Sequence, residues 1–227
     1  MHIIFFGDSL TQGTVGASYV DRLAALLPGH RFTNEGINGD TSLNLYRRLE
    51  TDVIARRPDG VFIMIGVNDA LSYSEPASRP YYRFVKRVPG GQIAPLAFRE
   101  NLRAVLARLL AAGIPPWVAL PPIESRPAAV AALRQMNAAA AAVCAELRIP
   151  TLDLLAALTP PDLPDRPSAS LRNYWRSLLY LLGLRSVERW QQQGGYTYTF
   201  DGVHLTADGA ARLAALVASF LRDHGVR

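Results

Sequence analysis

Residues 3–11 read IIFFGDSLT, and this stretch decides the fold. Its first four residues form a continuous apolar run, which is typical of a strand buried on both faces of a parallel sheet. A glycine, an aspartate and a serine then end the run. We therefore predict a buried first strand, followed directly by a small polar loop at the carboxyl end of that strand.

The rest of the chain alternates short apolar runs with longer segments of helical spacing. The predicted strands are Ile3–Phe6, Arg31–Asn34, Val61–Ile65, Trp117–Leu120 and Thr151–Leu155, and the predicted helices are Tyr19–Leu27, Ser42–Arg57, Pro95–Ala112, Ala128–Leu147 and Ala207–Leu221. Such alternation indicates the α/β class, with a parallel sheet covered by helices on both faces. In three-layer α/β/α sandwiches of this kind, ligands bind at the carboxyl ends of the strands.

Length and composition indicate one domain over residues 1–227. Apolar residues make up 49% of the chain, which supplies a packed core and excludes intrinsic disorder. Two segments interrupt the alternation, residues 71–93 and residues 159–198. We expect both to be insertions that border a substrate cleft, because long irregular segments in compact domains are often functional. A helix packed on the core is the alternative for the second.

The net charge of +5 raises the question of a nucleic-acid partner. The basic residues form small clusters at Arg47-Arg48, Arg56-Arg57 and Lys86-Arg87. We interpret them as scattered surface charge and expect no nucleic-acid partner. No apolar stretch looks long and uninterrupted enough for stable membrane insertion. Residues 1–6 lack the pattern of a signal peptide, which predicts a cytoplasmic protein.

Cys144 is the single cysteine, so the chain forms no internal disulfide. It lies in an alanine-rich helical segment without neighbouring ligand residues, which favours a buried structural thiol over a zinc site. We expect neither a metal nor an organic cofactor. The oligomeric state is left open.

Nucleophilic catalysis at Ser9 would need a base and a group that orients the base. Histidine is the usual base because its pKa lies close to neutral pH. Of the four histidines, His204 alone lies in a turn-rich segment just ahead of a helix, and Asp201 precedes it by three residues. Each residue taken singly has an ordinary structural explanation as a turn or capping residue.

Acyl transfer also needs fixed donors for the negative charge that develops on the carbonyl oxygen. Asn68 offers a side-chain amide, Gly39 a backbone N–H that a ligand can approach closely, and Ser9 its own N–H. Asp8 and Asp69 adjoin these residues, and we expect both to bind backbone N–H groups. Asp153 is a rival partner for His204, but its apolar surroundings favour Asp201.

Four ordered motifs carry a family resemblance: Gly7-Asp8-Ser9-Leu10, Gly39-Asp40-Thr41-Ser42, Gly66-Val67-Asn68-Asp69 and Asp201-Gly202-Val203-His204. This set resembles the SGNH (GDSL-type) hydrolase superfamily of esterases, lipases and acylhydrolases over nearly the whole chain. The resemblance implies a flavodoxin-like sheet. It also implies Ser9 as the nucleophile, Asp201 and His204 as the rest of the triad, and Ser9, Gly39 and Asn68 as oxyanion donors.

The sequence therefore predicts a serine hydrolase that cleaves carboxylic esters, or thioesters, through an acyl-enzyme. The substrate is expected to be a small-molecule ester with a small or lipid-like acyl group. Acetylated sugars, lysophospholipids, acyl thioesters and acylated peptides all remain open. The alternative from another class is a non-catalytic protein that binds an anion or a nucleotide on the same fold.

Overall fold

The computed structural model describes residues 1–160 and 187–226, built around a five-stranded parallel sheet. The strands are β1 (His2–Gly7), β2 (Arg31–Gly36), β3 (Gly60–Met64), β4 (Pro116–Leu120) and β5 (Thr151–Asp153). Their order in the sheet is β2-β1-β3-β4-β5, which is that of flavodoxin-like folds. The predicted parallel, flavodoxin-like sheet is confirmed.

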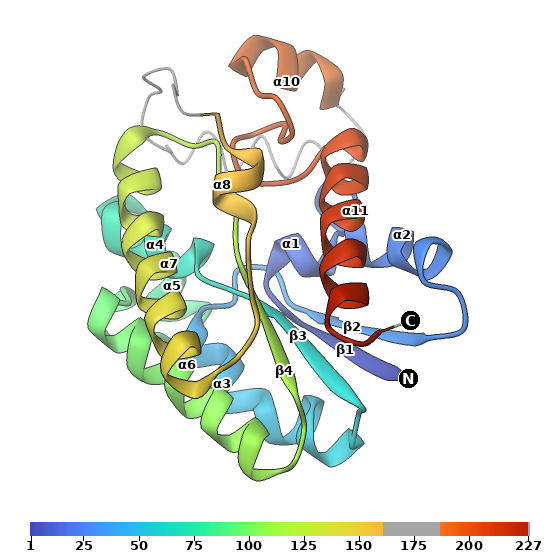
Figure 1. Cartoon of the computed structure of the whole chain (residues 1–227). Helices are drawn as coiled ribbons and strands as arrows, with labels where there is room; N and C mark the ends of the chain where they lie inside the picture. The colour runs from blue at the N-terminus through green and yellow to red at the C-terminus, as the bar shows by residue number, and fades with distance from the viewer. Residues whose placement is uncertain (161–186, 227) are drawn as a thin grey trace.

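Helices cover both faces of the sheet and complete the three layers (Figure 1). One layer pairs α2 (Tyr19–Leu26) with α11 (Ala207–Asp223), and the other contains α3 (Ser42–Asp52), α6 (Pro95–Ala111) and α7 (Pro127–Leu147). The shorter helices are α1 (Ser9–Gln12), α4 (Val67–Ser74), α5 (Arg79–Phe84), α8 (Leu154–Leu158) and α10 (Val187–Gly194). The predicted α/β/α sandwich is thus confirmed.

Strand β1 lies inside the sheet, because it pairs with both β2 and β3. All four residues of its apolar run are completely buried. The ring of Phe5 meets the rings of Tyr19, Phe32 and Phe62, with centroid distances of 6.0, 5.4 and 5.4 Å. Phe5, on β1, therefore joins α2 to the two neighbouring strands β2 and β3.

Two predicted elements end earlier than their apolar patterns suggested. The helix predicted over Ser42–Arg57 ends at Asp52, and a 3₁₀ turn, η1 (Ile54–Arg56), follows it. Aspartate and β-branched residues at this point are weak helix formers. The last strand ends at Asp153, whose carboxylate accepts a hydrogen bond from the backbone N–H of Ala156 at 2.9 Å and begins α8.

The segment 71–93, which was predicted to be irregular, is largely helical, and this corrects the prediction. Gly66 has a φ of 135°, and α4 begins directly after it. The turn η2 (Pro76–Ser78), helix α5 and the turn η3 (Pro89–Gly91) then follow. Each of these three elements has a proline at its first or second position, where proline is well tolerated.

Helix α7 corrects a further expectation, because it is long and apolar enough, by length and composition alone, to cross a membrane. It packs against α4, α6 and β4, and half of the apolar stretch is buried. Cys144 lies buried on this helix, as predicted, and burial raises the pKa of its thiol to about 11. Of the segment 159–198, residues 161–186 lie outside the described residues.

The central position of Phe5 can be tested by comparison with an exposed phenylalanine. Phe5→Ala should lower the free energy of unfolding by about 3–5 kcal/mol, since it removes a fully buried ring. Phe84 is 72% exposed, and Phe84→Ala should change the free energy of unfolding by less than about 0.5 kcal/mol. Urea unfolding followed by circular dichroism measures both. Equal losses in the two variants would contradict the assignment of Phe5 to the core.

Candidate active site

The carboxyl ends of three adjacent strands lead into three of the predicted site residues. Ser9 follows β1, Gly39 follows β2 and Asn68 follows β3. Parallel strands end at the same edge of a sheet, so the fold gathers these residues there. The three residues are buried or nearly so.

Ser9 is the first residue of α1 and is 6% exposed. Asp8 caps this helix, because its carboxylate accepts a hydrogen bond from the backbone N–H of Leu10 at 3.0 Å. As the first helical residue, Ser9 has a backbone N–H without an intrahelical partner. Within the described parts of the chain, neither that N–H nor the Ser9 hydroxyl forms a hydrogen bond with another protein group.

Asp201 and His204 form a direct pair, in which the carboxylate contacts Nδ1 of the imidazole at 2.7 Å. The same carboxylate accepts hydrogen bonds from the backbone N–H groups of Val203 at 3.0 Å and His204 at 2.8 Å. The side chain of Asp201 therefore closes the turn and also meets the ring. Nε2 remains on the opposite side of the imidazole from this contact.

Burial and ion pairing have opposite effects on the pKa values of Asp201 and His204. Burial lowers the pKa of His204, but the charge and the hydrogen bond of Asp201 outweigh that effect and raise it overall. Burial also raises the pKa of Asp201, while the attraction of His204 and three hydrogen bonds bring it below its ordinary value. The geometry thus favours an ionised Asp201 that stabilises a charged His204.

Glu124 holds the segment that precedes this pair, and no motif in the sequence pointed to it. Its carboxylate is completely buried and accepts five hydrogen bonds, from the backbone N–H groups of Thr197, Tyr198 and Thr199 and from the two threonine hydroxyls. The backbone N–H of Glu124 donates to the carbonyl of Gly202 at 2.9 Å. A lone acidic residue just beyond β4 was the only available signal.

Gly39 adopts a φ of 77°, which favours glycine. A Cβ at this position would lie 2.1 Å from the hydroxyl of Tyr81 and 2.9 Å from Cε of Lys86. Among the described residues, the buried N–H of Gly39 donates to no protein acceptor. Buried backbone donors are almost always paired, so unpaired ones at Gly39 and Ser9 are suited to a ligand oxygen.

The side-chain amide of Asn68 has a partner at each end. Its Nδ2 donates to the carboxylate of Asp8 at 3.2 Å, and its Oδ1 accepts from the hydroxyl of Tyr82 at 2.8 Å. Burial raises the pKa of Asp8 to about 7, although the hydrogen bond from Leu10 and the charge of His204 act against it. The charge of His204 thus acts on the same carboxylate that accepts a hydrogen bond from Asn68.

The two aspartates beside predicted site residues bind backbone N–H groups, as expected. Asp8 binds Leu10, and Asp69 accepts from the backbone N–H of Ser42 at 3.1 Å and from its hydroxyl at 2.6 Å. Burial raises the pKa of Asp69 to about 7, against the effect of these hydrogen bonds. Asp153, the rival partner for His204, instead caps α8.

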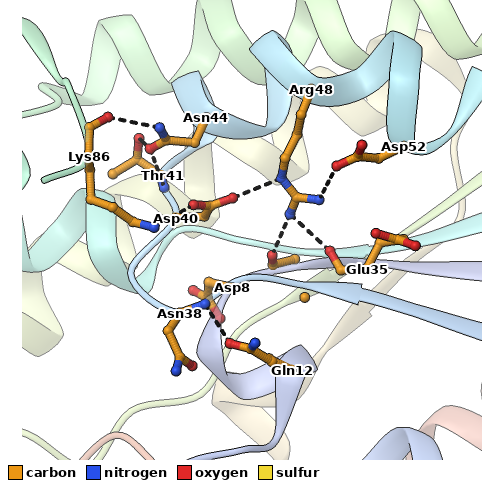
Figure 2. Close-up of polar contacts among 12 residues, drawn as sticks. Asp8, Gln12, Glu35, Asn38, Asp40, Thr41, Asn44, Arg48, Asp52 and Lys86 are labelled. Carbon is orange, nitrogen blue, oxygen red and sulfur yellow. Dashed lines mark hydrogen bonds and ion pairs between the residues drawn. The ribbon is translucent and has the colours of Figure 1, made fainter.

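Two of the basic residues interpreted as surface charge are largely buried beside Gly39, which corrects that interpretation. Asp40 pairs with Arg48 at 2.8 Å and with Lys86 at 2.8 Å, and the exposed fractions of the three side chains are 4%, 13% and 11%. Figure 2 shows the carboxylate of Asp40 between the two cations. The loop is further fixed to α1 by the backbone N–H of Asn38, which donates to Gln12 at 2.7 Å.

Metal binding has no obvious location in the described parts of the chain. There, no group of three or more histidine, cysteine, aspartate or glutamate side chains is placed to hold a metal ion. The arrangement instead offers a hydroxyl, an imidazole–carboxylate pair and three N–H donors at one sheet edge. These are the groups that acyl transfer requires.

Comparison with known proteins gives a match over most of the chain. A model of the GDSL-like lipase/acylhydrolase family matches residues 5–212. An acetylxylan esterase of Geobacillus stearothermophilus is 40% identical over 85 residues, which cover 30% of this chain and 39% of that protein. The chain thus matches less than half of the length of its curated relatives.

Solved structures extend the likeness to nearly the whole fold. A crystal structure of an acetylxylan esterase variant from Geobacillus stearothermophilus has a TM-score of 0.66 and 22% identity, covering 99% of this chain and 94% of that one. The lipase/acylhydrolase of Enterococcus faecalis has a TM-score of 0.63 and 21% identity, covering 98% and 96%. At this level of identity the likeness shows a shared fold.

The coupling of Asp201 to His204 predicts a specific titration. Asp201→Asn should lower the pKa of His204, because the attraction disappears while the burial remains. Asp153→Asn is the matched control and should leave the pKa of His204 where it is. Two-dimensional NMR of the imidazole C–H signals between pH 4 and 9 measures both. An unchanged His204 titration in Asp201→Asn would contradict the pairing.

Proposed function

The chain belongs to the GDSL-like lipase/acylhydrolase family, and on that premise we propose that it is a carboxylic ester hydrolase with a Ser9–His204–Asp201 triad. The observation that carries this proposal is the direct contact between the largely buried side chains of Asp201 and His204. The charge of His204 also acts on Asp8, the residue that precedes Ser9 and caps α1. The unpaired N–H groups beside Ser9 add support, since they offer donors to an oxyanion.

The reaction proceeds in two steps of acyl transfer. The hydroxyl of Ser9 attacks the ester carbonyl, and His204 takes its proton through Nε2. The tetrahedral intermediate collapses, the carbon–oxygen bond to the alcohol breaks, and His204 returns the proton to the departing alkoxide. Water then attacks the acyl-enzyme with His204 as the base, and the acid leaves while Ser9 regains its proton. Asp201 holds the tautomer and stabilises the imidazolium.

The hydrogen bond between the Ser9 hydroxyl and Nε2 of His204 forms during catalysis. No hydrogen bond joins their side chains in the described structure, and such bonds are often long in proteins without substrate. The N–H groups of Ser9 and Gly39 and the amide of Asn68 then receive the oxyanion. Because the protein fixes all three donors before the reaction begins, little reorganisation accompanies charge development.

The substrate we propose is an ester with a short acyl group, such as an acetylated saccharide. The side chains of Tyr81 and Lys86 crowd Gly39, which supports a small acyl group beside the oxyanion donors. The acetylxylan esterase among the relatives supports an acetyl group on a sugar. The lipid-like acyl esters and thioesters that the sequence also allows remain outcomes of the test.

Covalent labelling tests the nucleophile directly. A fluorophosphonate probe should label the protein once, and Ser9→Ala should abolish both labelling and ester hydrolysis. Ser18→Ala is the matched control, because the Ser18 hydroxyl caps α2 and accepts from the backbone N–H of Asp21. Intact-mass spectrometry measures the labelled fraction. Labelling that persists in Ser9→Ala would place the nucleophile on another residue and overturn the role of Ser9. An unlabelled native protein without esterase activity would favour the non-catalytic binding protein.

A series of p-nitrophenyl esters from acetate to palmitate tests the acyl group. We expect kcat/KM to be highest for acetate and to fall at least about tenfold by octanoate, because each added methylene must fit beside Gly39. Release of acetate from acetylated xylo-oligosaccharides, followed by NMR, tests the saccharide. A maximum of kcat/KM at laurate or palmitate would overturn the short-acyl proposal and leave the triad intact.

A further inference from the structure

We propose that Tyr82 is a positioning residue for ester hydrolysis, whose hydroxyl fixes the Asn68 amide with its N–H group presented to the oxyanion. This inference rests on the proposed function, since it concerns one of the three donors assigned there. Tyr82 comes from α5, in a segment that the sequence indicated to be an irregular insertion. The structure instead brings it into contact with the site.

The Tyr82 side chain is almost completely enclosed, with an exposed fraction of 2%. Its hydroxyl donates to Oδ1 of Asn68 at 2.8 Å, which is an ideal length for this kind of bond. The ring packs edge-to-face on Tyr81, with a centroid distance of 5.2 Å. The carbonyl of Tyr82 accepts from the backbone N–H of Val88 at 2.9 Å, so the backbone is fixed as well.

Tyr82 and an ionised Asp8 together permit only one orientation of the Asn68 amide. The phenol donates to Oδ1, while the carboxylate of Asp8 accepts from Nδ2 at 3.2 Å. Turning the amide by 180° would place Oδ1 against the ionised carboxylate of Asp8, which has no proton to donate. Nδ2 carries two hydrogens, and Asp8 takes one of them. The second is left for a ligand oxygen.

Fixing this amide matters because an oxyanion donor works by being oriented before the charge develops. Asn68 is 8% exposed, so water offers little alternative support for its carbonyl oxygen. Without the phenol, Oδ1 becomes a buried acceptor with no donor, and the amide can rotate to find one. The effect of Tyr82 on the reaction should therefore pass through Asn68.

The decisive experiment is a double-mutant cycle on Tyr82→Phe and Asn68→Ala, assayed with p-nitrophenyl acetate. Asn68→Ala should lower kcat by about 10²–10³, as expected for one lost donor, and Tyr82→Phe by about tenfold. KM should stay nearly constant in both, since the interaction strengthens only in the transition state. In the Asn68→Ala background, Tyr82→Phe should cause no further loss.

Two measurements separate positioning from a general structural effect. Tyr73 lies on α4 with Asn68 and is 38% exposed, so Tyr73→Phe makes the same chemical change and should leave kcat unchanged. Fluorophosphonate titration gives the concentration of competent sites, and kcat is expressed per labelled site at 10 °C. This correction keeps the test valid if Tyr82→Phe lowers the melting temperature.

The outcomes distinguish the inference from the function it rests on. If kcat per site in Tyr82→Phe stays within twofold of the native value while Asn68→Ala is strongly impaired, the role of Tyr82 is overturned and the esterase proposal stands. If the two losses multiply in the double variant, Tyr82 acts independently of Asn68 and the inference is again wrong. If Asn68→Ala itself hydrolyses the ester normally, the proposed oxyanion site fails first.

Discussion

The arrangement of the loops at the carboxyl edge of the sheet depends on the hydrogen bonds of the Arg48 guanidinium. It donates to Asp40 at 2.8 Å, to Asp52 at 3.0 Å, and to the carbonyls of Gly7 and Glu35 at 2.9 Å each (Figure 2). One side chain of α3 thus joins the ends of β1 and β2 to the loop that carries the candidate oxyanion glycine. A largely buried charge is tolerated only when its donors are satisfied in this way. Lys86 meets the other oxygen of Asp40 and holds the loop from the α5 side.

Other parts of the site are also held in place by buried polar groups. The five hydrogen bonds of Glu124 hold the strand-like segment that leads into Asp201. Asp8 and Tyr82 hold the amide of Asn68. The orientation of donors and base is therefore built by folding, which is the condition for electrostatic stabilisation without reorganisation. The buried hydrogen bonds that stabilise the fold therefore also orient the groups proposed for catalysis.

The features that the sequence predicted are local ones. The apolar run before Gly7 indicated β1, and the three-residue spacing of Asp201 and His204 indicated their contact, because both follow from neighbours along the chain. Glu124, Arg48 and Tyr82 could not be found in this way. The partners that give them their roles, such as Thr199 for Glu124, Gly7 for Arg48 and Asn68 for Tyr82, come from other elements, so only the folded topology brings them together. Prolines that open helical turns in segment 71–93 also resemble loop prolines when tertiary contacts are unknown.

The carboxylate of Asp8 links the two halves of the site electrostatically. Burial raises its pKa to about 7, and the charge of His204 acts in the opposite direction. Above that pKa the carboxylate of Asp8 is ionised and accepts from Asn68, and below it a protonated Asp8 loses acceptor capacity. His204, whose pKa is raised by Asp201 and Asp8, also gains a proton as the pH falls and then cannot act as a base. As the pH falls, the oxyanion donor therefore loses its fixed orientation and His204 loses its capacity to act as a base. The decrease in activity at acid pH is thus set by a coupled pair of groups, Asp8 and His204.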